Sequence, residues 1–287
     1  MRVVCYDLFM DVSQFTKNGK FLMLALDHRS SFKKLMNPQD PGSVTDQQAT
    51  QLKKEIIDSI KDQFSALLID QDWGLPAYTE KSKPFLLPIE KSGYEQSGDD
   101  RFTEIAVSID DLKRVGASGA KLLVYFNPWG KTAKKQLETS KKVLDDCKQN
   151  NFPLFLEIRT YDHDGEADQM EEAEREKIVI QSLKDFVAAG ILPDVYKLEY
   201  PGSIVACQTI TTILDPSKTP WVLLTMADTF ENFAKKLDEA VIRNCKGFLA
   251  GRALWQEVCK LQEEEKETFL KEILPQRFKR LTEIVNK

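Results

Sequence analysis

The chain has 287 residues, of which 42% are hydrophobic, and its formal net charge is −5 at pH 7. This composition is enough for a sizeable core, and the negative charge gives no electrostatic reason to expect nucleic acid as a partner. The N-terminus lacks the apolar stretch of a signal peptide, and no run of about 18 apolar residues predicts a membrane span. We therefore expect a soluble cytoplasmic protein with no nucleic-acid and no membrane partner.

Short apolar runs along the chain predict eight strands. They cover residues 21–27, 66–70, 85–90, 120–126, 154–160, 195–200, 222–227 and 247–251. Longer amphipathic segments between them predict helices at residues 48–64, 109–115, 132–150, 169–189, 229–244 and 253–286. Only the connection at residues 74–83, after the second strand, lacks a convincing helical pattern.

Strands that alternate with helices favour a closed parallel barrel over an open doubly wound sheet. An open sheet that binds a dinucleotide would have a glycine-rich turn after its first strand, where this chain has Leu26-Asp27-His28-Arg29. We expect an α/β protein with the TIM (β/α)8 fold, forming a single domain over residues 1–287. The long C-terminal helical stretch is expected to cover the barrel.

Cysteine and histidine usage points away from disulfides and metals. The cysteines are odd in number, widely separated and without Cys-x-x-Cys spacing, so we expect reduced structural thiols at Cys5, Cys147, Cys207, Cys245 and Cys259. The two histidines are too few for the clusters typical of zinc sites, and no metal or cofactor is expected. His163 is predicted to lie on the surface. His28 falls in the predicted site, either as a hydrogen-bonding residue or as a catalyst.

The active site of such a barrel lies at the C-terminal ends of its strands. Polar residues occur on each predicted strand, most of them near its end. They are Asp27, Asp70, Glu90, Lys121 (within its strand), Glu157, Lys197, Thr225, Gly251 and Arg252. One buried charge would be weak evidence, but so many on apolar strands predict an active site.

Lys197 is the most informative of these residues, because it lies inside a short apolar strand that stops at Pro201. Burial disfavours the charged ammonium and lowers the pKa of a lysine, which makes the amine nucleophilic. Lys197 is therefore a candidate Schiff-base residue. If the alternating strand faces point into the barrel, Lys121, Glu157 and Lys197 lie on three successive strands, which are spaced about 4.8 Å apart.

Lys121 would then lower the pKa of Lys197 further by like-charge repulsion, and Glu157 could carry protons as an imine forms. The alternative is that Lys197 and Glu157 are only a structural ion pair. Gly251 and Arg252 open the helix after the last strand, where barrels often bind phosphate. Taken without that position, Arg252 could equally be a surface arginine.

Six blocks of sequence resemble the class I tagatose-1,6-bisphosphate aldolases and their relatives, the sulfofructose-phosphate aldolases. In the order of that family they are ALDHRSSFK (25–33), LIDQDWGLPA (68–77), GAKLLVY (119–125), FLEIRTYD (155–162), DVYKLEYP (194–201) and GFLAGRALW (247–255). The blocks extend from the first predicted strand to the last, so their order is more specific than any single motif.

The resemblance implies a TIM barrel that reversibly cleaves a phosphorylated ketose, such as tagatose 1,6-bisphosphate, to dihydroxyacetone phosphate and an aldehyde. It implies catalysis through an imine on Lys197, with Glu157 as acid and base and without a metal. The substrate contacts that it implies are Asp27, Arg29, Lys121 and Thr225 for the sugar and its phosphate, and Gly251 and Arg252 for the other anionic end.

The chain also departs from the family pattern. A Ser-Ala-Gly pattern after the seventh strand reads Thr225-Met226-Ala227, and a frequent glutamine is replaced by His28. These changes leave the sugar open, so a sulfosugar or deoxysugar phosphate is an alternative substrate for the same chemistry. A second alternative is a non-catalytic barrel that senses sugar phosphates. Barrel aldolases are often homo-oligomers, but no sequence pattern here marks an interface.

Overall fold

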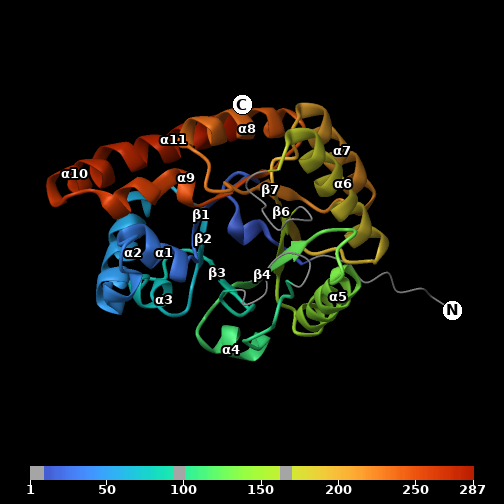
Figure 1. Ribbon diagram of the computed structural model, residues 1–287, viewed down its shortest axis with the longest axis horizontal. Coiled ribbons are helices and arrows are strands. Elements are labelled where there is room, and N and C mark those ends of the chain that lie inside the picture. The colour runs from blue at the N-terminus through green and yellow to red at the C-terminus, as the bar shows by residue number, and fades with distance from the viewer. Residues whose placement is uncertain (1–9, 94–100, 162–169) are drawn as a thin grey trace.

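The computed structural model describes residues 10–93, 101–161 and 170–287 (Figure 1). Within these ranges, eight parallel strands pair in chain order and close into a barrel between the eighth and the first. The strands are β1 (Phe21–Leu26), β2 (Ala66–Ile69), β3 (Phe85–Pro88), β4 (Gly119–Phe126), β5 (Leu154–Thr160), β6 (Val195–Leu198), β7 (Trp221–Leu223) and β8 (Gly247–Ala250). This confirms the predicted TIM (β/α)8 fold.

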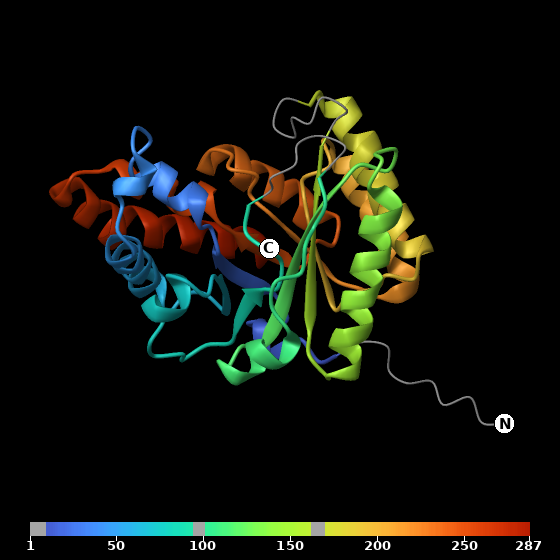
Figure 2. The ribbon, with the colours of Figure 1, turned by 60° about the horizontal axis from the view of Figure 1, so that its bottom comes forward.

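Helices surround the barrel, with α1, α2 and α3 on one side and α5, α6 and α7 on the opposite side (Figures 1 and 2). The first six are α1 (Ser30–Met36), α2 (Asp46–Ile60), α3 (Gly74–Ala77), α4 (Ile109–Arg114), α5 (Ala133–Gln149) and α6 (Glu172–Ala188). They are followed by α7 (Ile204–Leu214), α8 (Phe230–Ile242), α9 (Arg252–Trp255), α10 (Glu263–Thr268) and α11 (Leu274–Val285). Within the described ranges, no helix is long and apolar enough to cross a membrane.

Helix α2 illustrates how local sequence sets an element. The Thr45 side chain accepts the N–H of Gln48 at 3.2 Å, and the Gln48 side chain accepts the N–H of Thr45 at 2.9 Å. This reciprocal capping box satisfies two N–H groups that a helix start otherwise leaves unpaired. Leu52, Ile56 and Ile60 recur at helical spacing and are buried in the core. The helix therefore begins where the polar cap stands and packs along its apolar face.

The sequence prediction gave no bounds for helix α7. Its sequence, IVACQTITTIL, is rich in β-branched residues, which have modest helix propensity and favour strands. In the structure the Ser203 side chain caps it by accepting the N–H of Ala206 at 3.0 Å. The predicted helix at residues 253–286 is also divided. Helix α9 continues into a 3-10 turn at Gln256–Lys260, and residues 261 and 262 separate this turn from α10. A π-helical turn at Phe269–Ile273 then joins α10 to α11.

The barrel interior is apolar at the end opposite the polar strand ends. Phe155 belongs to the apolar cluster there, with its ring 5.1 Å from that of Phe15 and 6.0 Å from that of Phe21, both in edge-on contact. Val195 belongs to the same interior cluster. Since side chains alternate along a strand, the residues two positions after Phe155 and Val195 also face inward. These are Glu157 and Lys197, as the sequence predicted.

The described cysteines are free and buried, at Cys147, Cys207, Cys245 and Cys259. Burial raises the pKa of the Cys207 thiol to about 12, which keeps it protonated and unreactive at neutral pH. The prediction of unpaired structural thiols is confirmed for these four. Cys5 and His163 lie outside the described residues.

Candidate active site

A cavity of about 280 Å³ opens at the C-terminal ends of the strands. Its lining includes Asp27, Arg29, Lys121, Glu157, Lys197 and Arg252, all of which the sequence placed in the site. Two further predicted residues, Thr225 and Gly251, do not line the cavity in the described part of the chain. Thr225 is buried beyond the end of β7, and Gly251 caps α9 close to His28.

Lys197 and Glu157 form a buried ion pair at the base of this cavity. They are register partners on β6 and β5, and Lys197 Nζ lies 2.8 Å from Glu157 Oε2. Only 5% of Lys197 and 7% of Glu157 is exposed to solvent. Because both groups are withdrawn from water, their interaction is stronger than that of an exposed ion pair.

Lys121 connects this pair to two more carboxylates. It extends from β4, and its Nζ lies 2.7 Å from Glu90 Oε1, 2.9 Å from Asp27 Oδ2 and 3.3 Å from Glu157 Oε2. The register pairs Lys121 with Phe155, one layer below Glu157, so the long lysine stem spans the difference in height. Glu157 Oε2 is thus shared between the Lys121 and Lys197 ammonium groups.

Burial and the neighbouring charges shift the pKa values of the ionisable groups in this cluster. Burial alone would lower the pKa of Lys121, but Asp27, Glu90 and Glu157 outweigh it and raise that pKa well above its usual value. Burial would raise the pKa of Asp27, but Lys121 and Lys197 hold it far below the usual range, and the same two lysines lower the pKa of Glu157 against burial. For Glu90 burial prevails over Lys121, and the pKa of this carboxyl is raised.

Lys121 has more contacts than the sequence suggested. We expected it to lower the pKa of Lys197 by like-charge repulsion. In the structure its ammonium also faces three carboxylates, two after the ends of β1 and β3 and one on β5. Lys121 therefore holds the carboxylates of Asp27, Glu90 and Glu157 together and keeps them close to Lys197.

The rim of the cavity is positively charged. Arg29 donates from Nη2 to the carbonyl of Glu90 at 3.5 Å and lies 3.7 Å from Asp72. The described lining carries six lysine and arginine side chains against three carboxylates, a net formal charge of +3 with histidine neutral. Arg252 is the first residue of α9 and belongs to this lining, as predicted. Such a surplus favours an anionic ligand.

His28 is held in its neutral form. Burial is the main cause, and it lowers the pKa of His28 to about 3, although Asp27 opposes the shift. The imidazole packs edge-on against Trp255 with ring centroids 5.2 Å apart, and its Nδ1 lies 3.9 Å from Asp27 Oδ1. At neutral pH it can therefore offer a hydrogen-bond donor or acceptor to the cavity but no charge.

Sequence reasoning did not assign every lining residue to the site, and Glu90, Tyr125 and Arg159 are among those that it left out. Glu90 was noted only as a polar residue at a strand end. Arg159 Nε donates to the buried Glu199 at 2.6 Å, and Glu199 also accepts the Thr160 hydroxyl at 2.8 Å. The signal was present, because Arg159 lies two residues beyond Glu157 on the same strand face.

Asp70 differs from the other strand-end acids, because it does not line the cavity in the described structure. Its carboxylate is fully buried and pairs with Lys53 of α2. It also accepts the N–H groups of Asp72, Trp73 and Gly74 at 2.8 to 3.2 Å, which caps α3. Asp70 is therefore part of the scaffold under the site.

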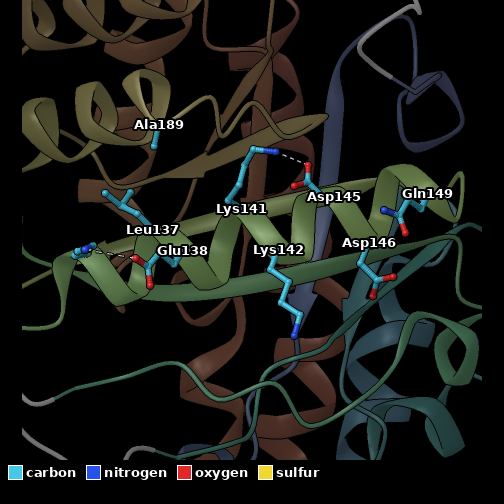
Figure 3. A pocket seen from close by; sticks show the side chains of 9 residues that line it. Leu137, Glu138, Lys141, Lys142, Asp145, Asp146, Gln149 and Ala189 are labelled. Carbon is cyan, nitrogen blue, oxygen red and sulfur yellow. Dashed lines mark hydrogen bonds and ion pairs between the residues drawn. The ribbon is translucent and has the colours of Figure 1, made fainter.

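A larger hollow, of about 860 Å³, lies on the outer side of α5 (Figure 3). Its charged side chains pair with one another along the helix, as Lys141 does with Asp145, and Lys134 with Glu138 at 3.9 Å. These are exposed i,i+4 pairs of the kind that covers a solvated helix face. This hollow contains none of the buried charged groups of the strand-end cavity. Among the described residues, no group of three or more His, Cys, Asp or Glu side chains could hold a metal ion.

Comparison with known proteins agrees with the predicted resemblance. The family model described as "Uncharacterized protein conserved in bacteria (DUF2090)" matches residues 9–287. The chain is 28% identical over 265 residues to tagatose 1,6-diphosphate aldolase of Lactococcus lactis subsp. lactis, covering 83% of this chain and 81% of that protein. It is 27% identical over 288 residues to tagatose 1,6-diphosphate aldolase of Staphylococcus haemolyticus, covering 90% and 87%.

Solved structures share the barrel. An archaeal fructose 1,6-bisphosphate aldolase superposes with a TM-score of 0.67 at 16% identity, covering 95% of this chain and 98% of that chain. Fructose-bisphosphate aldolase from Plasmodium falciparum superposes with a TM-score of 0.72 at 14% identity, covering 95% and 92%. At these identities the likeness shows a common fold.

Proposed function

The chain belongs to the DUF2090 family, and we propose that it is a class I aldolase, an aldehyde-lyase that reversibly cleaves a phosphorylated ketose. The observation that carries this proposal is the buried contact between Lys197 and Glu157 at the base of a cavity whose described lining has a surplus of positive charge. An amine beside a carboxylate is the pair that imine formation requires, and the surrounding cations suit a phosphorylated substrate. The similarity to tagatose 1,6-diphosphate aldolases supports the same reaction.

The reaction begins with transfer of a proton from the Lys197 ammonium to Glu157. The neutral amine then attacks the C2 ketone, and the resulting carbinolamine loses its hydroxyl as water with the proton returned by Glu157. This leaves a protonated imine on Lys197 and an ionised Glu157. The two-step use of one carboxylate is typical of general acid–base catalysis.

Cleavage follows when Glu157 takes the proton of the C4 hydroxyl. We assign this step to Glu157 rather than Asp27, because Glu157 contacts Lys197 Nζ directly at 2.8 Å, whereas the Asp27 carboxylate contacts Lys121 at 2.9 Å. The C4 oxygen forms the aldehyde, the C3–C4 bond breaks, and its electron pair enters the iminium to give an enamine. Protonation at C3 and hydrolysis release a three-carbon ketone phosphate, such as dihydroxyacetone phosphate, and restore Lys197.

The residues around this pair bind and orient the substrate. Lys121 and Asp27 contact the sugar hydroxyls, and Lys121 keeps Glu157 close to the reacting carbon. Arg29 and Arg252, which follow the adjacent strands β1 and β8, take the anionic groups. Tagatose 1,6-bisphosphate is the first substrate to test, and sulfosugar and deoxysugar phosphates belong in the same panel.

The test is borohydride reduction in the presence of dihydroxyacetone phosphate or a ketose phosphate, followed by peptide mass spectrometry. We expect a reduced adduct on Lys197, its loss in Lys197→Met, and no effect in Lys177→Met, a lysine that stacks on Trp129 outside the cavity lining. Turnover should withstand chelators. An adduct on another lysine, or binding of sugar phosphate without any adduct or cleavage, would instead favour a different mechanism or a sensing protein.

A further inference from the structure

Lys53 is the one fully buried lysine, among the described residues, that the proposed mechanism does not use. It lies on the inner face of α2, with no solvent exposure. Burying an ammonium group costs free energy unless acceptors surround it. Lys53 has such acceptors, because its Nζ contacts Asp70 and also two backbone carbonyls of the loop that follows β1.

Those two carbonyls lie on either side of a residue of the site. Lys53 Nζ donates to the carbonyl of Leu26 at 2.9 Å and to that of His28 at 2.8 Å. The residue between them is Asp27, whose carboxylate contacts Lys121 at 2.9 Å. A single ammonium therefore fixes the backbone immediately before and immediately after Asp27. Because only two backbone dihedrals per residue are soft, fixing both neighbours restricts where the Asp27 side chain can lie.

The position of Lys53 is itself well defined. Asp70 holds the ammonium from the β2 side and is in turn anchored by three N–H groups at the start of α3. The rings of Phe32 and Trp73 lie 5.0 and 5.5 Å from Nζ, at distances that suit cation–π contact. The lysine thus connects a rigid part of the scaffold to the β1 loop.

We propose that Lys53 is a positioning residue that places the Asp27 carboxylate against Lys121 through its hydrogen bonds to the carbonyls of Leu26 and His28. The effect continues along contacts already described, from Asp27 to Lys121, and from Lys121 to Glu157 beside the Schiff-base lysine. This inference rests on the proposed function, since Asp27 acts in the site proposed there. Lys53 is not itself a lining residue of the cavity, and it reaches the lining only at the backbone carbonyl of His28.

The first experiment measures kcat and KM for Lys53→Met, Asp27→Asn and the double variant with the ketose phosphate that the panel identifies. Misplacement of a site residue by about 1 Å can reduce a rate by on the order of 100-fold. We therefore expect Lys53→Met to lower kcat by about 10- to 100-fold, but by less than about twofold when Asp27 is already Asn. An equal loss in both backgrounds would overturn the proposal.

Lys33→Met is the matched control. Lys33 also contacts the Trp73 ring, at 4.7 Å, and pairs with Asp46 at 2.8 Å, but no bond joins it to a carbonyl beside Asp27 in the described structure. Its kcat should stay within about twofold of the parent value. A loss comparable to that of Lys53→Met would show that any lysine removed near Trp73 disturbs the site, which contradicts a specific role.

Asp70→Asn keeps the experiment decisive if Lys53→Met does not fold. It removes the charge of the ion pair, but the amide oxygen of Asn can still accept a hydrogen bond from Lys53 Nζ, which also keeps its two carbonyl acceptors. The melting temperature should therefore fall while kcat stays within about twofold. If Asp70→Asn loses kcat as much as expected for Lys53→Met, the effect belongs to the ion pair as a whole and the proposal is wrong.

Hydrogen–deuterium exchange separates this inference from the proposed function. Amide exchange is followed in the peptide that contains residues 26–31. It is measured in Lys53→Met, provided that this variant folds, and in Asp70→Asn for comparison. We expect faster exchange in that peptide with Lys53→Met and little change with Lys33→Met. This result does not depend on turnover, so failure to find any aldolase activity would reject the proposed function alone. Unchanged exchange in Lys53→Met would reject the positioning role.

Discussion

Lys197 and Glu157 are register partners on adjacent strands, and their charged atoms meet at 2.8 Å at the base of the strand-end cavity. They are 40 residues apart in the chain, on the two strands of one strand–helix–strand unit whose helix is α6. The barrel therefore places an amine and a carboxylate in direct contact and shields both from water. Lys121 shares the same carboxylate oxygen and links the pair to Asp27 and Glu90.

Glu157→Gln tests the proton-transfer role. The amide keeps the size of the side chain but cannot carry a proton between the amine and the departing hydroxyl. We expect kcat to fall by about 10²- to 10⁴-fold with a smaller change in KM, measured by steady-state kinetics of ketose phosphate cleavage. Glu138→Gln, which alters an exposed acid that pairs with Lys134 on α5, is the control and should leave kcat unchanged. Full activity of Glu157→Gln would reject Glu157 as acid and base.

Lys121→Met should destabilise the fold. It leaves the buried carboxylates of Asp27 and Glu90 without their shared ammonium, and removal of one partner from a buried ion pair costs about 3–5 kcal/mol. Lys91→Met provides the comparison, because Lys91 pairs with Glu104 at 3.2 Å in an exposed position, where such a pair contributes about 0–1 kcal/mol. Urea unfolding at pH 7 measures both. Equal effects would mean that the Lys121 cluster does not contribute more than a surface pair.

His28 should make folding sensitive to mild acid. Its pKa falls from 6.5 to about 3 in the folded protein, mainly through burial. As the pH falls from 6.5 towards 3, the unfolded chain therefore takes up a proton that the folded protein excludes, and stability is lost. The slope from this one group is at most about 1.4 kcal/mol per pH unit. His28→Gln should lose less stability than the parent between pH 7 and pH 5 in urea titrations, and parallel curves would contradict the prediction.

Gly247→Ala should prevent barrel closure. Gly247 begins β8 with φ of +137°, and a Cβ added there would lie 2.0 Å from the carbonyl oxygen of Phe21 on β1. The backbone of one of the two strands would have to move, so we expect a loss of at least about 3 kcal/mol of stability or no folded protein. Gly190→Ala is the control, since its φ is +68° but nothing lies within 4 Å of the added carbon, and the cost should be about 1–2 kcal/mol. Thermal unfolding followed by circular dichroism compares the two.

Some features of the site followed from the chain alone. The apolar strands and their alternation predicted that Glu157 and Lys197 share the barrel interior, because side chains on a strand alternate with a period of two. The position of Arg252 after the last strand was likewise predictable, since the loops of a barrel gather at one end. Other features were not. Helix α7 has a sequence that favours strands, and only its cap at Ser203 and its packing on the barrel select the helix.

Apolar periodicity, strand alternation and the order of the sequence blocks were thus enough to predict the barrel and its pair of Lys197 and Glu157. The tertiary structure alone decided that Lys121 lies among three carboxylates and that Lys53 holds the backbone on both sides of Asp27. The physical reason is the distance along the chain over which these contacts act. Lys121 and Asp27 are 94 residues apart, so no local pattern encodes their meeting, and it exists only once the barrel has closed.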